Sequence, residues 1–556
     1  MATLRELLDE GKARHMAGRL DAAGRCYEAA LTLAPYDAEA NHLCGMLAFQ
    51  RGRLDAAAAH FRDAARVDPD NAKYHGNLGA VLLALGRHDD ALDCLDRAVA
   101  LDPAVANVLT NRALTLLRLG RDEEALGAAR RAASLAPGDA GVHAARGLAL
   151  MALERLDDAV SALQRAAALD PGDADVRGNL GGALHRLYRH EEAQAALKTA
   201  LTLAPDRPAG WNNLGQACRA ANDMTAAIDA FDRALALDSG YREARFGRAR
   251  SALMLGRWSE GWTDYRARDL GADADGRLYR EVLPHDLSGR HVFVDREQGI
   301  GDELFFLRFL PALASRGCRI TYRADRRLAP MLRRAAIAPR VMSQDEEAAP
   351  ADYGVTVGDL PFLLGHGDGD ALPPSIALSA EPARGRALKA RLEAAGPPPW
   401  VGITWRAGFS HGLHASRKQA PLAGLGRALR GARGTFVAVQ RYPRAGEIEA
   451  IADATGRPVA DFTAVNEELE DALALMGLLD RYVCVSNTNL HFRAGLGRTS
   501  SVLAPCPPEI RWMAEGGESP WFPGTPVYRQ RPDGDWSDAL AALAASVEAD
   551  SPARRP

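Results

Sequence analysis

The feature that most constrains this chain is a proline that returns every 34 residues through its first half. Small residues keep the same register, with glycine or alanine in one column and alanine in two others. Two antiparallel helices approach closely only where their facing side chains are small, and proline ends the second helix of each pair. The period therefore predicts a stack of helix pairs, an α-solenoid, over residues 1–270. The prolines are Pro35, Pro69, Pro103, Pro137, Pro171 and Pro205.

The columns of this solenoid resemble those of the tetratricopeptide-repeat (TPR) family. The small-residue column runs through Gly11, Gly45, Gly79, Ala113, Gly147, Gly181, Gly215 and Ala249. A turn glycine separates the two helices of a pair at Gly18, Gly52, Gly86, Gly120 and Gly256. The resemblance covers about residues 4–270 and implies seven repeats and a degenerate eighth. In that eighth repeat Ser239 stands where the next proline would fall, and Gly261 and Arg268 replace two alanines, which suits a capping or docking repeat.

One column of the solenoid is polar where packing does not require polarity. It holds Asn77, Asn111, Asn179 and Asn213 and is interrupted by Ala145. The column lies on the first helix of each pair, which lines the inner surface of a TPR superhelix. Because asparagine both donates and accepts hydrogen bonds, a row of them can grip the backbone of an extended polypeptide, and the row resembles the ladder of the O-GlcNAc transferase family. The alternative is hydrogen bonding between neighbouring repeats, and the sequence leaves both open.

Charge and cysteine content exclude several classes of protein. The 556 residues carry 68 Lys and Arg against 72 Asp and Glu, so neither a polybasic nucleic-acid binder nor an acidic tail is expected. Only five of the basic residues are lysines. The seven cysteines show no zinc-like spacing, which favours a reducing compartment. A charged N-terminus and the lack of any apolar run of about 18 residues predict a cytoplasmic protein with no transmembrane segment.

Beyond residue 270 the helical period stops, and short apolar segments alternate with helices. A small polar linker is predicted at Gly271–Gly276, followed by strands at His291–Val294 and Cys318–Tyr322 with the spacing of a βαβ unit. A proline run at 397–399 precedes further predicted strands at 400–405, 435–440, 482–486 and 501–503. We therefore predict two Rossmann-like α/β units, at 285–395 and 398–550, with a ligand cleft beyond the carboxyl ends of their strands.

A glycine loop, Gly299-Ile-Gly301-Asp302, follows the first predicted strand. It lacks the third glycine of the dinucleotide fingerprint, because Leu304 stands there, so bound NAD is not expected. Asp302 has two interpretations: a cap of the following helix, or a general base toward an acceptor hydroxyl or amide. Arg406, after the strand at 400–405, is a candidate for neutralising phosphate, and an ordinary surface role is its alternative.

Two further groups of residues are candidates for ligand contacts. The close pair His411 and His414 has no carboxylate or cysteine near it in the sequence and is not expected to bind a metal. Aromatic residues gather at Trp512 and in Ser519–Pro523. They are interpreted either as stacking on a base or sugar or as packing between the two α/β units.

Several motifs follow one another in this half. They are Glu297-Gln-Gly-Ile-Gly-Asp-Glu-Leu304, Trp405-Arg-Ala-Gly408, Lys418, Asn487–His491 with Arg493-Ala-Gly495, and Ser519-Pro-Trp-Phe-Pro523. Their order resembles bacterial TPR proteins whose C-terminal half is a GT-B glycosyltransferase domain related to the heptosyltransferases, over about residues 285–550. The resemblance implies a GT-B-like pair of Rossmann-type units and transfer of a sugar from a nucleotide-sugar donor, without a resident cofactor.

The same resemblance assigns roles to single residues. It implies that Asp302 is the catalytic base, that Lys418 contacts the donor diphosphate and that Glu447 holds the nucleotide ribose. No Asp-x-Asp pair stands out as a metal site, so helix dipoles and basic groups are expected to activate the donor. The expected donor-binding residues are Gly299, Gly301, Arg406, Lys418, Glu447, Ser486, Asn487, Thr488 and His491.

One motif departs from the family pattern. The segment Ser486–His491 matches the family's Asp-Thr-x-x-x-His motif in length and in His491, but Ser486 stands where the family commonly has Asp and Asn487 where it has Thr. Hydroxyl and amide groups at a helix N-terminus can still hold a phosphate. Two functions stay open: a glycosyltransferase whose acceptor, a protein or a glycan, is presented by the solenoid, and a non-catalytic adaptor whose α/β half docks or senses a nucleotide.

Overall fold

A computed structural model describes residues 2–268, 279, 281–297, 299–347, 350–407 and 419–549. The predicted linker at 271–276, the pair His411 and His414, and Lys418 lie outside the described residues. The chain divides into two compact units, Met1–Pro205 and Asp206–Pro556. No described helix is both long and apolar enough to cross a membrane.

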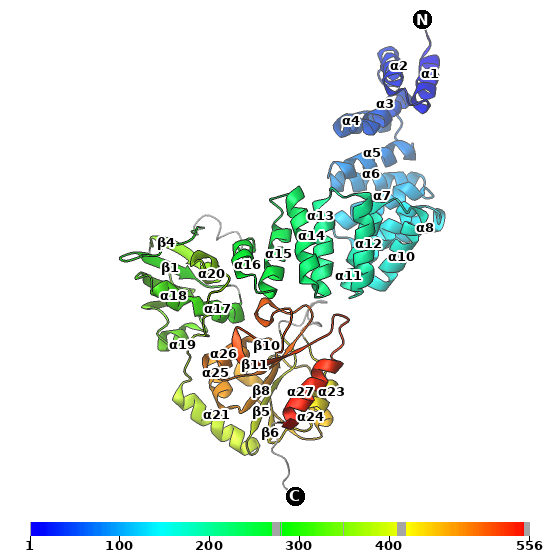
Figure 1. The fold of residues 1–556 in the computed structure, drawn as a ribbon. Helices are drawn as coiled ribbons and strands as arrows, with labels where there is room; N and C mark the ends of the chain where they lie inside the picture. The colour runs from blue at the N-terminus through cyan, green and yellow to red at the C-terminus, as the bar shows by residue number, and fades with distance from the viewer. Residues whose placement is uncertain are drawn as a thin grey trace. The chain divides into compact units, whose positions relative to one another are not determined.

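The first unit is a stack of antiparallel helix pairs in the order of the repeats (Figure 1). Each pair joins a helix of 13 residues to one of 14 residues. The helices are α1 (Leu4–Met16), α2 (Leu20–Leu33), α3 (Ala38–Gln50), α4 (Leu54–Val67), α5 (Ala72–Ala84), α6 (His88–Leu101), α7 (Ala106–Arg118), α8 (Asp122–Leu135), α9 (Ala140–Ala152), α10 (Leu156–Leu169), α11 (Ala174–Arg186) and α12 (His190–Leu203). The solenoid predicted from the proline period is confirmed.

The regular spacing of small residues has a direct packing cause. A Cβ atom built on Gly79 would lie 2.6 Å from Cγ of Leu95 on the paired helix, so a larger residue there would push the pair apart. The turn between the helices needs a left-handed residue, which Gly86 supplies with φ of 74°. Glu154 and Tyr188 occupy the same turn position in later repeats and adopt φ of 59° and 66°.

The second unit begins with two more helix pairs. They are α13 (Pro208–Ala220), α14 (Met224–Leu237), α15 (Arg242–Met254) and α16 (Trp258–Tyr265). The last helix is short, with eight residues, and packs tightly, because a Cβ atom on Gly261 would lie 2.5 Å from Cδ2 of Leu253. Trp258 and Trp262 of α16 belong to the same hydrophobic core as the strands and helices that follow. The degenerate eighth repeat is therefore continuous with the core of the first sheet.

The first sheet has four parallel strands in the order β3-β2-β1-β4. The strands are β1 (His291–Asp295), β2 (Arg319–Ala324), β3 (Arg340–Ser343) and β4 (Tyr353–Thr356). Its helices are α17 (Ile300–Phe306), η1 (Leu307–Phe309), α18 (Leu310–Ala314), α19 (Ala329–Arg334), η2 (Val357–Asp359) and α20 (Leu360–Leu363). The chain reverses its direction of travel across the sheet between β1 and β4, which makes this pair the topological switch point.

The second sheet is larger and runs β10-β11-β9-β8-β5-β6-β7, with β10 antiparallel and the other strands parallel. Its strands are β5 (Trp400–Thr404), β6 (Thr435–Ala438), β7 (Val459–Asp461), β8 (Arg481–Val485), β9 (Ser501–Ala504), β10 (Glu518–Ser519) and β11 (Phe522–Arg529). Renumbered along the chain, the six parallel strands follow the doubly wound order 3-2-1-4-5-6. The switch point of this sheet lies between β5 and β8.

Two groups of helices accompany the second sheet (Figure 1). One group holds α23 (Leu422–Leu429), α24 (Glu447–Thr455) and α27 (Ser537–Ala549), and the other α21 (Pro382–Ala395), α25 (Leu469–Leu478) and α26 (Thr488–Gly495). Two 3₁₀ turns, η3 (Thr463–Asn466) and η4 (Ile510–Trp512), complete the unit. All five residues of β5 are buried, as expected for a central parallel strand between two helix layers.

The predicted α/β architecture of the second half is confirmed as parallel and mixed sheets, while the GT-B fold stays a prediction. No separate element is predicted from the sequence for the residues of α21, which precede the proline run at 397–399. They form a helix of 14 residues that buries only Leu388 and Leu392. With so few buried positions, the helix carries little apolar periodicity in its sequence.

Candidate functional site

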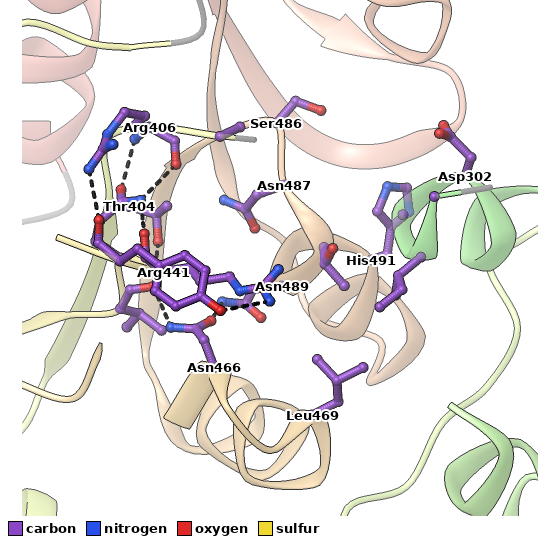
Figure 2. A pocket seen from close by; sticks show the side chains of 18 of the residues that line it. Asp302, Thr404, Arg406, Arg441, Asn466, Leu469, Ser486, Asn487, Asn489 and His491 are labelled. Carbon is purple, nitrogen blue, oxygen red and sulfur yellow. Dashed lines mark hydrogen bonds between the residues drawn. The ribbon is translucent and has the colours of Figure 1, made fainter. Parts of the chain in front are cut away.

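A cavity of about 440 Å³ opens beyond the carboxyl ends of β5 and β8, at the switch point of the second sheet. Figure 2 shows Asp302 on one side of it and Arg406 on the opposite side, with Ser486, Asn487 and His491 between them. The lining residues are Gly299, Ile300, Gly301, Asp302, Arg327, Thr404, Arg406, Ala407, Val439, Gln440, Arg441, Tyr442, Asn466, Leu469, Ser486, Asn487, Thr488, Asn489, His491, Glu509 and Arg511. The structure thus brings the glycine loop of the first α/β unit together with the Ser486–His491 segment of the second.

Asp302 lies in the first turn of α17 and does not cap it. The N-cap residue is Gly299, and no side chain accepts a hydrogen bond there, so the capping interpretation of Asp302 is wrong. The Asp302 carboxylate instead forms an ion pair with Arg511 across the cavity. Its side chain keeps 47% of its surface exposed, so a ligand can still reach the carboxylate.

His491 is buried beneath this ion pair. Nη1 of Arg511 donates to Nε2 of His491 at 2.8 Å. Burial, followed by the positive charges of Arg511 and Arg308, lowers the pKa of His491 well below its ordinary value. His491 is therefore neutral near pH 7, and because Nε2 accepts a hydrogen bond, its proton resides on Nδ1. The residue supports Arg511 without adding a charge.

Glu509 supplies a carboxylate beside Ser486. Oγ of Ser486 donates to Oε2 of Glu509 at 2.8 Å, and the same carboxylate oxygen lies 3.3 Å from Nε of Arg511. A carboxylate therefore stands next to Ser486, the position at which the family that these motifs resemble commonly has Asp. Neither Glu509 nor Arg511 was predicted as a site residue, because Ser486 and Asp302, which they contact, belong to other segments of the chain.

The N-terminus of α26 is fixed by its own asparagine. Asn487 is the N-cap: its Oδ1 accepts from the Leu490 amide at 3.3 Å, and its Nδ2 donates to the Val485 carbonyl at 2.8 Å. Asn489, which the sequence did not single out, donates to Oδ1 of Asn466 at 3.0 Å. The first turn of α26, including Thr488, faces the cavity with backbone amides that can receive an anion.

Arg406 and Glu447 form a buried ion pair at the opposite wall. Arg406 is 4% exposed, so its interpretation as a surface arginine is wrong. Oε2 of Glu447 accepts from Nη2 of Arg406 at 3.0 Å, from Nε1 of Trp405 at 3.1 Å and from the Arg444 amide at 2.9 Å. Glu447 is not among the residues lining the cavity, and its predicted contact with a ribose stays a prediction.

The charges of the cavity favour an anionic ligand. Four arginines line it, Arg327, Arg406, Arg441 and Arg511, against the carboxylates of Asp302 and Glu509. Within the described ranges, no group of three or more His, Cys, Asp or Glu side chains is arranged to hold a metal ion. Arginine side chains and helix amides together suit phosphate oxygens.

The aromatic residues near the C-terminal end lie in the core. Trp512 and Trp521 are 0% and 2% exposed, and neither lines the described cavity. The Trp521 ring packs edge-to-face on Trp258 and on Phe305, with centroids 5.0 and 5.1 Å apart. These contacts favour the packing interpretation over stacking on a ligand.

In the solenoid the four asparagines differ in their surroundings. Nδ2 of Asn77 lies 2.8 Å from Nε2 of His42 in the preceding repeat, which fits the hydrogen-bonding alternative at that position. Asn111 and Asn179 are half-buried, and Asn213 is exposed. Close to this column, a groove of about 640 Å³ is lined by Ala80, Leu83, Ala84, Leu114, Leu117, Arg118, Leu148 and Ala152.

Comparisons with known proteins identify the helical part. A family model for the tetratricopeptide repeat matches residues 8–72, 44–106, 77–140, 144–193 and 188–242. Protein FlbA of Caulobacter vibrioides is 28% identical over 333 residues, covering 54% of this chain and 54% of FlbA. The chain therefore spans about half the length of that relative.

Solved structures similar to this chain include TTC0263, a TPR protein of Thermus thermophilus, with 27% identity and a TM-score of 0.29 over 33% of this chain and 99% of that one. YrrB, a TPR protein with an unusual peptide-binding site, has 21% identity and a TM-score of 0.29 over 34% of this chain and 97% of that one. From the family model and the helix pairs, the N-terminal 260 or so residues form a tetratricopeptide-repeat solenoid.

Proposed function

We propose that this protein is a glycosyltransferase that moves a sugar from a nucleotide-sugar donor to an acceptor presented by the solenoid. The observation that carries the proposal is the cavity at the β5–β8 switch point, where an acidic side chain of one α/β unit faces an anion-binding wall of the other. The resemblance of the C-terminal motifs to heptosyltransferase-related GT-B enzymes supports the same proposal.

In the proposed reaction the donor diphosphate lies against the amides of α26 and the guanidinium groups of Arg406 and Arg511. Asp302 accepts the proton of the acceptor hydroxyl or amide while the acceptor atom bonds to the anomeric carbon. The bond from that carbon to the phosphate oxygen breaks, and the nucleoside diphosphate leaves with the bonding electron pair. Arginines and helix amides stabilise the charge that develops on the leaving group.

One observation favours the second candidate, a nucleotide-binding adaptor without catalysis. The Asp302 carboxylate is engaged in an ion pair with Arg511, and taking up a proton would break that pair. An adaptor would use the same cavity only to bind a nucleotide. If the protein is such an adaptor, replacing Glu509, which also contacts Arg511, should change only the affinity for the nucleotide.

Nucleotide binding and turnover separate these functions. We expect UDP, GDP or ADP to raise the melting temperature of the full-length protein, by the usual coupling of ligand binding to stability. With the cognate nucleotide sugar, Asp302→Asn should abolish transfer and keep most of the donor affinity. The exposed Asp345→Asn, on the same α/β unit, is the matched control and should change neither. Full transfer by Asp302→Asn would contradict the general-base role, and no response to any nucleotide would contradict both functions.

We further propose that the solenoid binds a polypeptide acceptor. The half-buried Asn111 and Asn179 and the neighbouring apolar groove support this role. Replacing both asparagines by Ala should lower transfer to a protein acceptor without changing hydrolysis of the donor. If the acceptor is a glycan that does not use the groove, transfer should stay at the wild-type level.

A further inference from the structure

A buried arginine that follows the last repeat of the solenoid contacts the edge of the first sheet at which β1 and β4 end. Arg268 follows α16 and is 7% exposed. Its Nη2 donates to Oε1 of Glu297 at 2.6 Å and to Oγ1 of Thr356 at 3.0 Å, and its Nη1 donates to Asp359. These partners stand at the carboxyl ends of the neighbouring strands β1 and β4. Arg268 therefore occupies the switch point of this sheet, where open α/β sheets commonly bind a ligand.

The side chains around Arg268 are tightly packed. A Cβ atom on Gly358 would lie 2.0 Å from Oε1 of Glu297 and 2.7 Å from Nη2 of Arg268, so only glycine fits there. The guanidinium also lies over the Tyr265 ring, 4.9 Å from its centroid. Two buried carboxylates, Glu297 and Asp359, share this one cation. Without it they would be left unpaired in a buried site, which is strongly unfavourable.

The cluster leads directly into the cavity. Glu297 stands two residues before Gly299, whose carbonyl accepts the Glu303 amide at 2.8 Å and so begins the helix that carries Asp302. Burial raises the pKa of Glu297 even though Arg268 opposes the shift, so the carboxylate depends on this cation to stay charged.

The other member of the cavity's ion pair is held by the same repeats. Arg511 lies in η4, and Ala514 follows that turn. The Ala514 carbonyl accepts from Nδ2 of Asn222 at 3.0 Å, and the Ala514 amide donates to the Met254 carbonyl at 2.9 Å. Asn222 follows α13, and Met254 ends α15. The last two helix pairs thus contact the segments that present both Asp302 and Arg511.

We propose that Arg268 is a positioning residue that fixes Glu297 and, with it, the start of the helix that carries Asp302, so that the last repeat of the solenoid sets where Asp302 meets Arg511. The inference rests on the proposed function only in the choice of a nucleoside diphosphate as the ligand whose affinity is measured. Arg268 lines no part of the described cavity, so its influence on ligand binding is exerted through Glu297.

Amide hydrogen exchange of the full-length protein tests this role without a ligand. We expect Arg268→Gln to raise exchange in residues 299–306 at least about tenfold, which corresponds to about 1.4 kcal/mol of local stability. Gly358→Ala, in the turn η2 that follows β4, disturbs the same cluster and should have the same local effect. The control is Arg248→Gln in α15. It removes the ion pairs of Arg248 with Asp264 and Asp232, both at 2.6 Å, and these carboxylates belong to helices of the solenoid.

Nucleotide affinity is the second measurement. Arg268→Gln should weaken binding of the responsive nucleoside diphosphate about tenfold, again about 1.4 kcal/mol. Arg248→Gln should lower the melting temperature but keep wild-type affinity and wild-type exchange in 299–306. Unchanged exchange there in both Arg268→Gln and Gly358→Ala would overturn the proposal. If the wild-type protein binds no nucleotide, the proposed function fails, while the exchange experiment still decides the role of Arg268.

Discussion

Glu447→Gln separates two interpretations of the wall opposite Asp302. In one, Glu447 holds the ribose of a bound nucleotide, as the family resemblance implies. In the other, it neutralises Arg406, with which it forms a buried ion pair 3.0 Å long. The substitution keeps the shape of the side chain and removes its charge, and the two interpretations predict opposite changes in nucleotide affinity.

The size of the effect follows from the geometry. Two unit charges 3.0 Å apart at an effective dielectric constant of about 20 attract by about 5.5 kcal/mol, and desolvation offsets part of this. Removing one partner of a buried pair costs roughly 3–5 kcal/mol, so the variant should melt at a clearly lower temperature. In this interpretation the Glu447 carboxylate also repels a bound phosphate, so its loss should tighten nucleotide binding roughly tenfold after screening by salt.

Calorimetric titration with the responsive nucleoside diphosphate measures the affinity, and differential scanning fluorimetry the stability. The control is Glu449→Gln, on the same helix but exposed, which should change neither quantity. Binding that weakens about tenfold, as expected when a hydrogen bond from a ribose to a charged group is lost, would refute the ion-pair interpretation and support the ribose contact. A melting temperature equal to that of the wild type would refute the estimated strength of the pair.

Three further predictions concern stability. Glu154→Gly should stabilise the solenoid by about 0.5–1 kcal/mol in a circular-dichroism melt, because Glu154 holds a left-handed turn that glycine adopts without strain; a lower melting temperature would contradict this. Burial raises the pKa of Glu303 to about 7 from 4.5, so its stabilising contribution is complete below pH 4.5 and is lost as the pH rises through 7. The wild type should therefore lose about 2.5 kcal/mol more than Glu303→Gln between pH 5 and 8, whereas parallel pH profiles would refute the shift. Trp262→Ala should destabilise the second unit by about 3–5 kcal/mol in denaturant unfolding, and a loss below 1 kcal/mol would contradict its burial at 2% exposure.

The solenoid was predictable because each repeat is a local structure. Its helix lengths, turns and close contacts are set within about 34 residues, so the period alone indicates them. Buried strands were also predictable, since β5 and β8 are short apolar runs. The edge strand β7 has only three residues, none of them fully buried, and left no comparable signal.

The site was predictable only in part. Asp302 and Ser486–His491 were found because short motifs carry them, and the structure places both at one cavity. The partners of these residues were not found: Arg511 lies 209 residues after Asp302, and Glu509 lies 23 residues after Ser486. Pairings of this kind depend on how strands are ordered in the sheets, which no local pattern of side chains encodes.

The aromatic side chains of α16 have a consequence for how this protein can be divided. A cut at the end of the repeats would separate Trp258 and Trp262 from Trp521 and Phe306, against which they pack. Both fragments would then expose a wide apolar surface to water, and each would tend to aggregate. The α/β half is therefore inseparable from its last repeats, and exchange of one solenoid for another during evolution would have to leave α15 and α16 in place.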